Sequence, residues 1–226
     1  MLKILRMDND PIVLVVTPLL PNHKISGITR KTIKRNDIPI AWVSYTGNNN
    51  IPTNTQNGIN EYLLKYQEPP FFLMLDNDIE LGRYMIDRMV DKLSKSKVHE
   101  AYCYASFEFK GFITTSFPAI DFNIGKLLQH NYISSNSLIK LDCLRFIGGM
   151  VTDDTYRRLL DWCLFLKLLL HGYIGIPCPE AHFIAHSTED SISAGGPNDY
   201  KLKHQRVYND FIRPILTTFS RLDAKT

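Results

Sequence analysis

Three short apolar runs in the first third of the chain constrain its fold more than any other feature. They are residues 11–17 (PIVLVVT), 40–45 and 71–75, and the first is apolar at nearly every position. A strand that is apolar on both faces is typical of a parallel sheet covered by helices on both sides. Helices are expected between the runs, at residues 26–35 and 57–65. We therefore predict an α/β sandwich with a mainly parallel central sheet and helices on both faces.

The rest of the chain predicts further strands and helices. Ser26 is expected to cap the first helix, and Gly172 to end an apolar helix that begins at Thr152 or Asp153 and runs to about Leu170. The other predicted elements are a helix at residues 79–93, strands at residues 101–109, 111–118 and 132–135, and a polar helical tail at residues 198–221, bent at Pro214. The sequence contains no repeat or linker, which indicates a single domain.

Composition and charge exclude several classes of protein. The 226 residues, 44% hydrophobic and 22% charged, are typical of a soluble globular chain and unlike a disordered, collagen-like or coiled-coil protein. A net charge of +3 is too small to indicate binding to nucleic acid. Four cysteines without a C-x-x-C pair argue against a zinc site and predict buried thiols in a reducing compartment. With no signal peptide and no spanning segment in the sequence, we expect a cytoplasmic protein.

An acidic tripeptide, Asp76-Asn77-Asp78, directly follows the third apolar run. If the chain stays extended there, both carboxylates point to one side, at the edge of the sheet where open α/β folds bind ligands. Two carboxylate ligands suit Mn²⁺ or Mg²⁺. The alternative is that Asp78 only caps a following helix. A second copy of the tripeptide at residues 8–10 has no strand before it and is interpreted as a solvated turn.

Several weak motifs follow this tripeptide in a characteristic order. They are a Ser/Asn-containing stretch ending in Gly-Gly (residues 131–150, NYISSNSLIKLDCLRFIGGM), an Asp-Trp helix ending in Gly (residues 159–172, LLDWCLFLKLLLHG) and a Pro-Glu-Ala segment (residues 177–181, PCPEA). Together with LMLDNDIE around the tripeptide, this order resembles the inverting family 2 glycosyltransferases of the GT-A fold. The resemblance covers roughly residues 11–190 and implies a Rossmann-like GT-A sandwich.

The resemblance also implies roles for individual residues. Asp76 and Asp78 would hold a divalent metal ion, Mn²⁺ or Mg²⁺, bound to the diphosphate of a sugar nucleotide. His186 would be a third ligand, with His182 as the competing candidate. Asp161 would be the general base that deprotonates the acceptor hydroxyl. The alternative for Asp161 is a solvent-facing position beside the two arginines that precede it.

Five residues are expected to contact the donor by the same resemblance. Thr17 and Pro18 would lie beside the nucleoside, and Tyr45 could stack on its base. Asn57 would lie near the sugar and diphosphate, the alternative being an ordinary helix start. Asn77, between the two acids, completes the set.

The sequence departs from the family pattern in three places. The acidic pair expected after the second strand is replaced by Ser44-Tyr45-Thr46. The acidic residue that often precedes the Asp-Trp step is Leu160, and an Arg later in that helix is Lys167, which keeps the charge but loses the bidentate geometry. The identity of the nucleotide base therefore stays open.

The implied reaction is metal-dependent, inverting transfer of a hexosyl group from a nucleoside diphosphate sugar, a UDP-sugar being favoured, to a glycan or glycoconjugate hydroxyl. One domain is expected, with a nucleotide-binding half at residues 11–100, an acceptor and catalytic half at 101–195, and a helical tail at 196–226. Two alternatives stay open, a non-catalytic carbohydrate-binding relative and a sugar nucleotidylyltransferase, against which the glycine-free loop at residues 18–22 counts. A further alternative is that the chain is one domain of a larger glycosylating protein.

Overall fold

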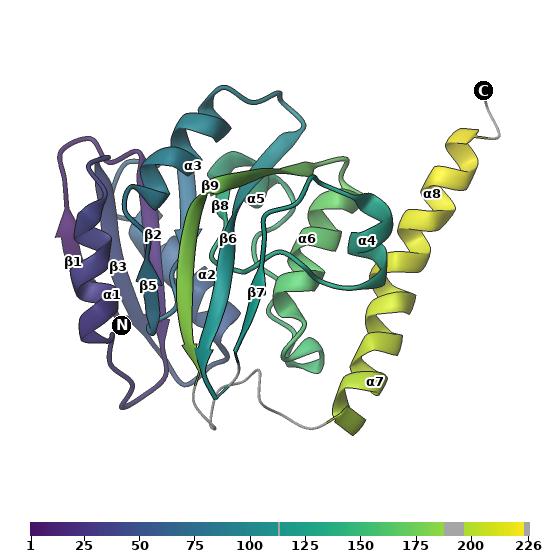
Figure 1. The fold of residues 1–226 in the computed structure, drawn as a ribbon, viewed down its shortest axis with the longest axis horizontal. Coiled ribbons are helices and arrows are strands. Elements are labelled where there is room, and N and C mark those ends of the chain that lie inside the picture. Colours follow the sequence, from purple (N-terminus) through teal and green to yellow (C-terminus); the bar gives the residue numbers. More distant parts are fainter. Residues whose placement is uncertain (113, 188–196, 224–226) are drawn as a thin grey trace.

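The structure is a computed structural model that describes residues 1–112, 114–187 and 197–223. Within these residues, nine strands form one sheet in the order β1-β3-β2-β4-β8-β6-β9-β5, with β7 paired to β6 (Figure 1). The strands are β1 (Leu2–Met7), β2 (Val13–Leu19), β3 (Ile40–Thr46), β4 (Phe71–Met74), β5 (Ile79–Leu81), β6 (Glu100–Gly111), β7 (Thr115–Phe117), β8 (Leu138–Lys140) and β9 (Ile174–Ser187).

The sheet is mixed, with a parallel part where the sequence predicts one. β2 pairs in parallel with both β3 and β4, as expected for the three apolar runs, and β6 pairs in parallel with β9. β8 lies between β4 and β6 and is antiparallel to both, so β2, β3, β4, β6 and β9 all run in one direction. β1, β5 and β7 are antiparallel to their neighbours. The prediction of a mainly parallel sheet therefore holds for these five strands, whereas the others run against them.

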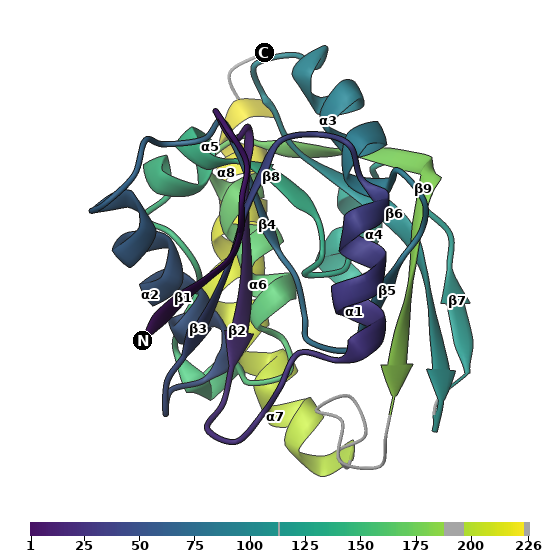
Figure 2. The same ribbon diagram turned by 90° about the vertical axis from the view of Figure 1, so that its left-hand side faces the viewer.

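Helices cover both faces of the sheet, with α1 and α3 on one side and α2, α5 and α6 on the other (Figure 2). The helices are α1 (Gly27–Thr32), α2 (Ile51–Leu63), α3 (Met85–Ser94), α4 (Ile124–Gln129), α5 (Leu141–Phe146), α6 (Leu160–Leu170), α7 (Pro197–Val207) and α8 (Arg213–Asp223).

Burial on both faces explains the continuous apolar run of β2. Val13 and Val15 belong to the core cluster on the α3 side, whereas Leu14 and Val16 belong to the cluster with α2 and α6. All four side chains are fully buried. Each such burial contributes about 1.5–3 kcal/mol, so a strand with polar residues on one face could not replace β2 at the centre of this sheet.

The helix predicted at residues 79–93 is wrong in its first half. Ile79–Leu81 form β5, which pairs with β9 through Ile79 and Ala185, and only Met85–Ser94 are helical as α3. Tyr84, at a φ of +57°, separates the two elements. Ile79 and Gly82 match a helical spacing, but pairing with a strand one hundred residues later outweighs this local pattern.

Three further boundaries differ from the prediction. α2 begins at Ile51, because Asn50 caps it by accepting a hydrogen bond from the Thr53 N–H. The strand predicted at residues 132–135 is instead an irregular segment, and the strand is β8, a few residues later. α6 begins at Leu160 rather than near Thr152, because Arg158 has a φ of +77° and interrupts the helix.

Two predicted helix ends are confirmed. Ser26 caps α1, since its hydroxyl oxygen accepts the Thr29 N–H at 3.1 Å. Gly172, at a φ of +82°, follows the last residue of the α6 turn in the left-handed conformation that suits glycine.

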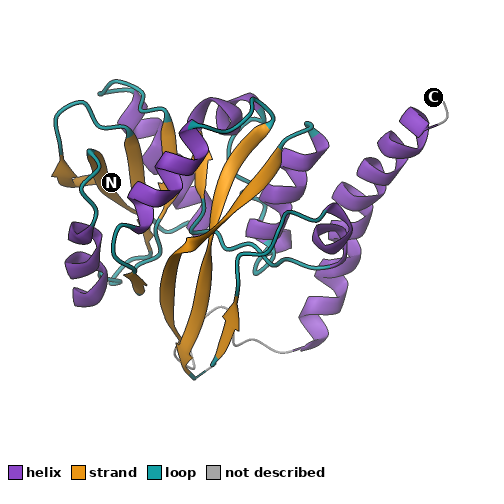
Figure 3. Cartoon of the chain, turned by 45° about the horizontal axis from the view of Figure 1, so that its top comes forward, coloured by secondary structure: helices purple, strands orange, loops and turns teal. Residues whose placement is uncertain are grey.

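The C-terminal tail is helical, as predicted, and packs on the rest of the fold (Figure 3). A π-helical turn at Tyr208–Ile212 joins α7 to α8, so the irregularity falls just before Pro214. Val207, Ile212 and Ile215 are buried in the same core cluster as α6. The tail therefore contributes to the core.

The prediction of buried thiols is confirmed. All four cysteines are buried and free. Among the helices of the described residues, none combines the length and the apolar character needed to cross a membrane.

Candidate functional site

The acidic tripeptide lies in a turn at the carboxyl end of β4. Asn77 and Asp78 form the turn, so the extended conformation assumed from the sequence does not occur. α1 holds this turn, because the Ser26 N–H and the Thr29 hydroxyl both donate to the Asn77 carbonyl oxygen, at 2.8 and 3.1 Å. Burial, and then the charge of Asp78, raise the pKa of Asp76, so the two carboxyls of this turn influence each other.

Asp76 is held by the segment that precedes β8. The Asp76 N–H donates to Asn136 Oδ1 at 3.0 Å, and Asn136 Nδ2 donates back to Asp76 Oδ2 at 2.9 Å. The Ser135 hydroxyl approaches the same oxygen at 3.4 Å. Burial and then the charge of Asp78 raise the pKa of Asp76 to about 6, although these hydrogen bonds act in the opposite direction.

The register of β5 on β9 brings His186 opposite Asp78. Ile79 pairs with Ala185, and the His186 N–H donates to the Asp78 carbonyl oxygen at 3.4 Å. Burial raises the pKa of Asp78, and the charge of His186 acts against this rise. His186 is exposed, and its Nε2 lies 3.3 Å from Glu80 Oε2. Of the two histidine candidates, His186 is thus the one beside the acidic turn.

His182 lies four residues before His186 in β9. Its carbonyl oxygen accepts the Gly82 N–H at 2.9 Å, and its ring lies against Gly82. It therefore neighbours the far end of β5 and not the tripeptide.

Asp161 lies in the first turn of α6, partly buried. Its Oδ2 accepts Asn131 Nδ2 at 2.9 Å, and its Oδ1 accepts the Trp162 N–H at 2.8 Å. Burial, together with the charge of Asp76, raises the pKa of Asp161 to about 6. The helix start is anchored because Trp162 is fully buried and its indole N–H donates to the Leu127 carbonyl oxygen at 2.6 Å. Asp161 is therefore partly exposed but engaged by Asn131 and by the start of α6.

The residues expected beside the nucleoside lie at the ends of β2 and β3. Pro18 and Tyr45 are paired in the register of these strands, and Tyr45 is partly exposed. Thr17 is fully buried, and its hydroxyl oxygen accepts the Trp42 indole N–H at 3.0 Å. The structure therefore does not bring the Thr17 hydroxyl to the acidic cluster, that is, to Asp76 and Asp78 after β4.

Asn54, rather than Asn57, is the α2 residue that contacts the ends of these strands. Asn57 is partly buried inside α2, well after the helix start. Asn54 Nδ2 donates to the carbonyl oxygens of Leu19, Gly47 and Asn49, at 3.0–3.1 Å. It thereby fixes the loop that follows β3, in the region where the family pattern has its missing acidic pair.

Sequence reasoning missed Asn131, Asn136 and Asn54 as individual site residues. The first two lie in a polar stretch, N-Y-I-S-S-N-S, that precedes an apolar strand. Polar residues are rarely buried without a hydrogen-bonding role, and here Asn136 is only 3% exposed. The polar stretch was therefore detectable in the sequence, but the residues that it contacts, Asp161 and Asp76, were not.

The two carboxylates of Asp76 and Asp78 suit a divalent cation whose other ligands come from water and phosphate oxygens. No three His, Cys, Asp or Glu side chains of the described residues lie close enough together to hold a metal ion by themselves. Within the same residues, neither Asp76 nor Asp78 forms an ion pair with Lys or Arg. Two carboxylates with the remaining positions taken by water and phosphate oxygens is the arrangement that suits Mg²⁺.

The second Asp-Asn-Asp copy is structural. It directly follows β1 (Leu2–Met7), so the prediction that no strand precedes it is wrong, and Asp8 is partly buried rather than solvated. Asp8 pairs with Arg6 at 2.7 Å and accepts the Ile40 N–H at 2.9 Å, which ties the end of β1 to β3. Burial alone would raise the pKa of Asp8, but these two partners outweigh it and lower the pKa. The first aspartates of two identical tripeptides thus have pKa values shifted in opposite directions, down for Asp8 and up for Asp76.

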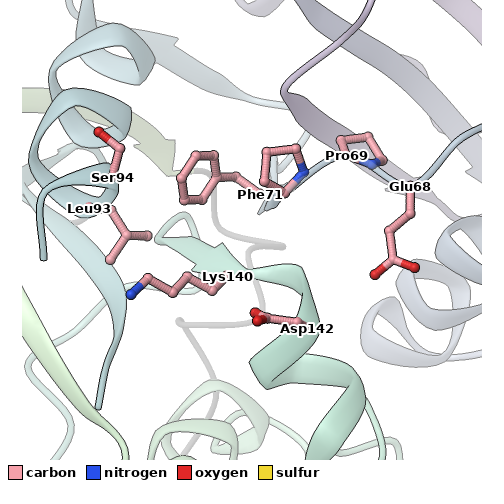
Figure 4. Close-up of a pocket in the computed structure, with 8 residues that line it drawn as sticks. Glu68, Pro69, Phe71, Leu93, Ser94, Lys140 and Asp142 are labelled. Carbon is pink, nitrogen blue, oxygen red and sulfur yellow. The ribbon is translucent and has the colours of Figure 1, made fainter. Parts of the chain in front are cut away.

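A cavity of about 540 Å³ lies at the other end of β4 (Figure 4). Glu68, Phe71, Lys140 and Asp142 are among the residues that line it. Phe71 begins β4 whereas Asp76 follows its end, so the cavity is separate from the acidic cluster. Open α/β sheets bind ligands at the carboxyl ends of their strands, which favours the acidic cluster as the functional site.

Comparisons with known proteins were made by family, by sequence and by structure. No protein-family model matches the sequence, and no curated protein matches it significantly. Among solved structures, residues 1–349 of S. aureus TarS in complex with UDP-GlcNAc match with a TM-score of 0.61 and 10% identity, covering 87% of this chain and 66% of TarS. The same protein with UDP matches at 0.58 and 9%, covering 84% and 62%. The mannosyltransferase PcManGT from Pyrobaculum calidifontis, in complex with GDP-Man and Mn²⁺, matches at 0.53 and 13%, covering 96% and 75%.

These likenesses concern the fold. The chain spans just under two thirds of the TarS structures that it matches. The order and spacing of its motifs, its mixed sheet covered on both faces and these structural neighbours agree with one another. The chain has a GT-A-like α/β fold.

Proposed function

We propose that the protein is a metal-dependent, inverting glycosyltransferase. It would move a sugar from a nucleoside diphosphate sugar, with a UDP-sugar favoured, to a hydroxyl of a glycan or glycoconjugate. The proposal rests chiefly on two acids from distant parts of the chain, Asp76 at the carboxyl end of β4 and Asp161 at the start of α6, each held by an asparagine of residues 131–136. Asp78 follows Asp76 in the same turn, and the charge of Asp76 adds to the burial that raises the pKa of Asp161. Fold neighbours solved with UDP-GlcNAc, UDP, or GDP-Man and Mn²⁺ support this donor class.

In this proposal, Asp161 is the general base. Its carboxylate takes the proton of the acceptor hydroxyl while the hydroxyl oxygen attacks the anomeric carbon from the face opposite the diphosphate. The new glycosidic C–O bond forms as the C–O bond to the diphosphate breaks, so the configuration is inverted. A carboxyl with a pKa of about 6 is largely ionised at neutral pH and still basic enough to accept the proton. A base positioned in this way typically contributes about 10²–10⁴-fold to the rate.

The two acids of the turn would bind the donor through a metal ion. Asp76 and Asp78 would hold Mn²⁺ or Mg²⁺. His186, opposite Asp78 in the β5–β9 register, is the candidate for a further ligand, although among the described residues the three side chains do not form a ready-made metal site. When bound, the metal ion stabilises negative charge on the departing nucleoside diphosphate. The chain's own part is to present the two carboxylates, Asp76 through its contacts with Asn136 and Asp78 through the turn held by α1.

The other donor contacts remain part of the proposal. They are Thr17, Pro18, Tyr45, Asn57 and Asn77. Tyr45 has the best support, because it is partly exposed at the end of β3. Thr17 has the least, because its hydroxyl is already engaged by Trp42 inside the protein.

The acceptor, the domain context and the cellular location are also matters of proposal. The chain covers less than two thirds of TarS, so the acceptor, the linkage and membership of a larger glycosylating protein are open to test. We retain the nucleotide-binding half at residues 11–100, the acceptor half at 101–195 and the tail at 196–226 as a working division. A cytoplasmic location is supported by the four free thiols.

The first experiment tests donor class and metal together. Thermal unfolding is followed with UDP, UDP-GlcNAc or GDP-Man, each with Mn²⁺ or with EDTA. We expect a nucleotide to raise the melting temperature only with Mn²⁺, since a ligand that binds the folded state stabilises it. Equal stabilisation in EDTA would contradict the metal role of Asp76 and Asp78.

The second experiment tests the base. Asp161→Asn should keep the nucleotide-dependent rise in melting temperature and lose about two or more orders of magnitude in acceptor-dependent release of nucleoside diphosphate. Asp91→Asn, on the outer face of α3, is the matched control and should behave as wild type. A rate for Asp161→Asn within a few-fold of wild type would remove Asp161 as the base, and a product with retained anomeric configuration by NMR would exclude inversion.

A further inference from the structure

Two asparagines from one short segment hold two acids of the candidate site. Asn136 contacts Asp76, and Asn131 contacts Asp161. We propose that residues 131–136 form a bridge that sets the position of the base relative to the metal-binding acids, with Asn131 and Asn136 as positioning residues. The inference rests on the proposed function and adds to it how the donor side and the acceptor side are kept in register.

Asn136 fixes both the backbone and the side chain of Asp76. Its amide oxygen accepts the Asp76 N–H and its amide nitrogen donates to Asp76 Oδ2, which closes a two-bond ring. The Ser135 hydroxyl adds a longer contact to the same oxygen. Among the described residues, Asp76 Oδ1 accepts no hydrogen bond. The carboxylate is therefore oriented with one oxygen engaged by the bridge and the other available to a cation.

Asn131 orients Asp161 in a similar manner. Its amide oxygen accepts the Ile133 N–H at 3.1 Å, which leaves its amide nitrogen turned toward Asp161 Oδ2 at 2.9 Å. An amide N–H only donates and does not ionise, so it favours the carboxylate form of Asp161 at any pH. Asp161 is thus oriented as a proton acceptor, and it forms no ion pair with Lys or Arg in the part of the chain that the structure describes.

The bridge is itself rigidly anchored. Directly after it, β8 pairs with β4 through Leu138 and Leu73, and with β6 through Leu138 and Cys103. Ser137 donates to the Ser134 carbonyl oxygen at 2.7 Å, and Ile133 is buried in the core. Because the segment is short and fixed at several points, a displacement of one asparagine changes the separation of the two acids.

That separation matters for an in-line displacement. The acceptor oxygen must lie in reach of the base while the anomeric carbon is held by the donor diphosphate. A misplacement of about 1 Å can reduce the rate about 10²-fold. Residues that support metal ligands from behind typically contribute about 10–100-fold to metal affinity or activity.

The test separates the two ends of the bridge. Mn²⁺ binding is measured by electron paramagnetic resonance of free Mn²⁺, alone and with UDP, and acceptor-dependent UDP release from UDP-GlcNAc is measured at saturating donor. Asn136→Ala should weaken Mn²⁺–UDP binding about 10–100-fold. Asn131→Ala should leave this binding within twofold of wild type and lower kcat about 10–100-fold without raising KM for the donor.

The matched control is Asn123→Ala. Asn123 also accepts a backbone N–H, that of Lys126 at 2.8 Å, but contacts neither acid. This variant should lose some stability and keep both wild-type Mn²⁺–UDP binding and kcat. Asn131 is partly exposed, so Asn131→Ala tests the bridge even where Asn136→Ala does not fold.

The outcomes distinguish failure of the bridge proposal from failure of the proposed glycosyltransferase function. If wild type binds Mn²⁺–UDP and releases UDP, but the asparagine variants match Asn123→Ala, the bridge is wrong and the proposed function stands. A wild-type protein that binds no nucleoside diphosphate, with or without Mn²⁺, overturns both. The expected split, affinity for Asn136→Ala and kcat for Asn131→Ala, supports both.

Discussion

Replacing Asp76 with Asn should stabilise the metal-free protein at pH 8. Burial and the charge of Asp78 raise the pKa of Asp76 from 3.8 to about 6. Each pKa unit corresponds to about 1.36 kcal/mol, so the ionised carboxylate costs at most about 3 kcal/mol of folding free energy. Because the side chain keeps some contact with water, we expect the variant to gain roughly 1–3 kcal/mol. An asparagine can still accept the hydrogen bond from Asn136 Nδ2.

The gain should depend on pH in a defined window. The folded pKa of Asp76 lies above its unfolded value, so the folded state binds more protons between about pH 4 and 6. The stability of wild type therefore falls as the pH rises through this window. Below about pH 4 the carboxyl is protonated in both states, and Asp76→Asn should have no advantage.

The second tripeptide provides a control of opposite sign. The pKa of Asp8 is lowered, because the hydrogen bonds from Arg6 and the Ile40 N–H and the charge of Arg6 outweigh its burial. Its ionised form stabilises the fold above about pH 4, and this contribution is lost as the pH falls through the lowered pKa. Asp8→Asn should therefore destabilise the protein by roughly 0.5–1.5 kcal/mol at pH 8, and by less in acid.

Urea unfolding followed by tryptophan fluorescence measures both effects. Trp42 and Trp162 are buried, so their emission reports loss of the core. Adding Mn²⁺ should stabilise wild type, by about 2.7 kcal/mol at a hundredfold excess over Kd, and should not stabilise Asp76→Asn comparably. If Asp76→Asn is no more stable than wild type at pH 8, or gains equally at pH 4 and pH 8, the argument from buried charge is refuted.

Three predictions of stability follow from single contacts, each measured by the same urea unfolding. Thr17→Val leaves the buried Trp42 indole N–H without an acceptor, so it should lower the free energy of unfolding by about 1–3 kcal/mol and leave nucleotide binding unchanged. Thr17→Ser should cost less stability. Weaker nucleotide binding by Thr17→Val would instead favour a donor contact. Gly149→Ala should lower the free energy of unfolding by about 1–3 kcal/mol, because Gly149 has a φ of +82° and the new Cβ would displace Gln56 Oε1 from the Met150 N–H. An unchanged stability would show that the Gly-Gly turn relaxes. Ile212→Ala should cost about 2–5 kcal/mol if the tail is part of the core, and a loss below 1 kcal/mol would argue that it is not.

Local sequence signals predicted the elements whose causes are local. The continuous apolar runs at β2, β3 and β4 predicted central strands, because only a strand covered on both faces is apolar throughout. Ser26 and Gly172 predicted helix ends, because capping acts within three or four residues.

Predictions failed where distant pairing determined the conformation. β5 was predicted as helix because Ile79 and its neighbours match a helical spacing, but it pairs with β9. The segment at residues 132–135 was predicted as a strand, but it forms local hydrogen bonds with neighbouring residues, and Ser135 contacts Asp76. Periodicity carries no information about such partners.

By itself, the sequence predicted the order β2-α1-β3-α2-β4, an acidic tripeptide after β4 and an acid within the helix that became α6. Only the tertiary structure decided which side chains hold those acids: Asn136 for Asp76 and Asn131 for Asp161, separations of 60 and 30 residues. It also decided that His186, rather than His182, lies opposite Asp78. The physical reason is the range of the forces involved. Burial pattern and capping are written into neighbouring residues, whereas a hydrogen bond of 2.9 Å between distant segments exists only after the sheet has set their register.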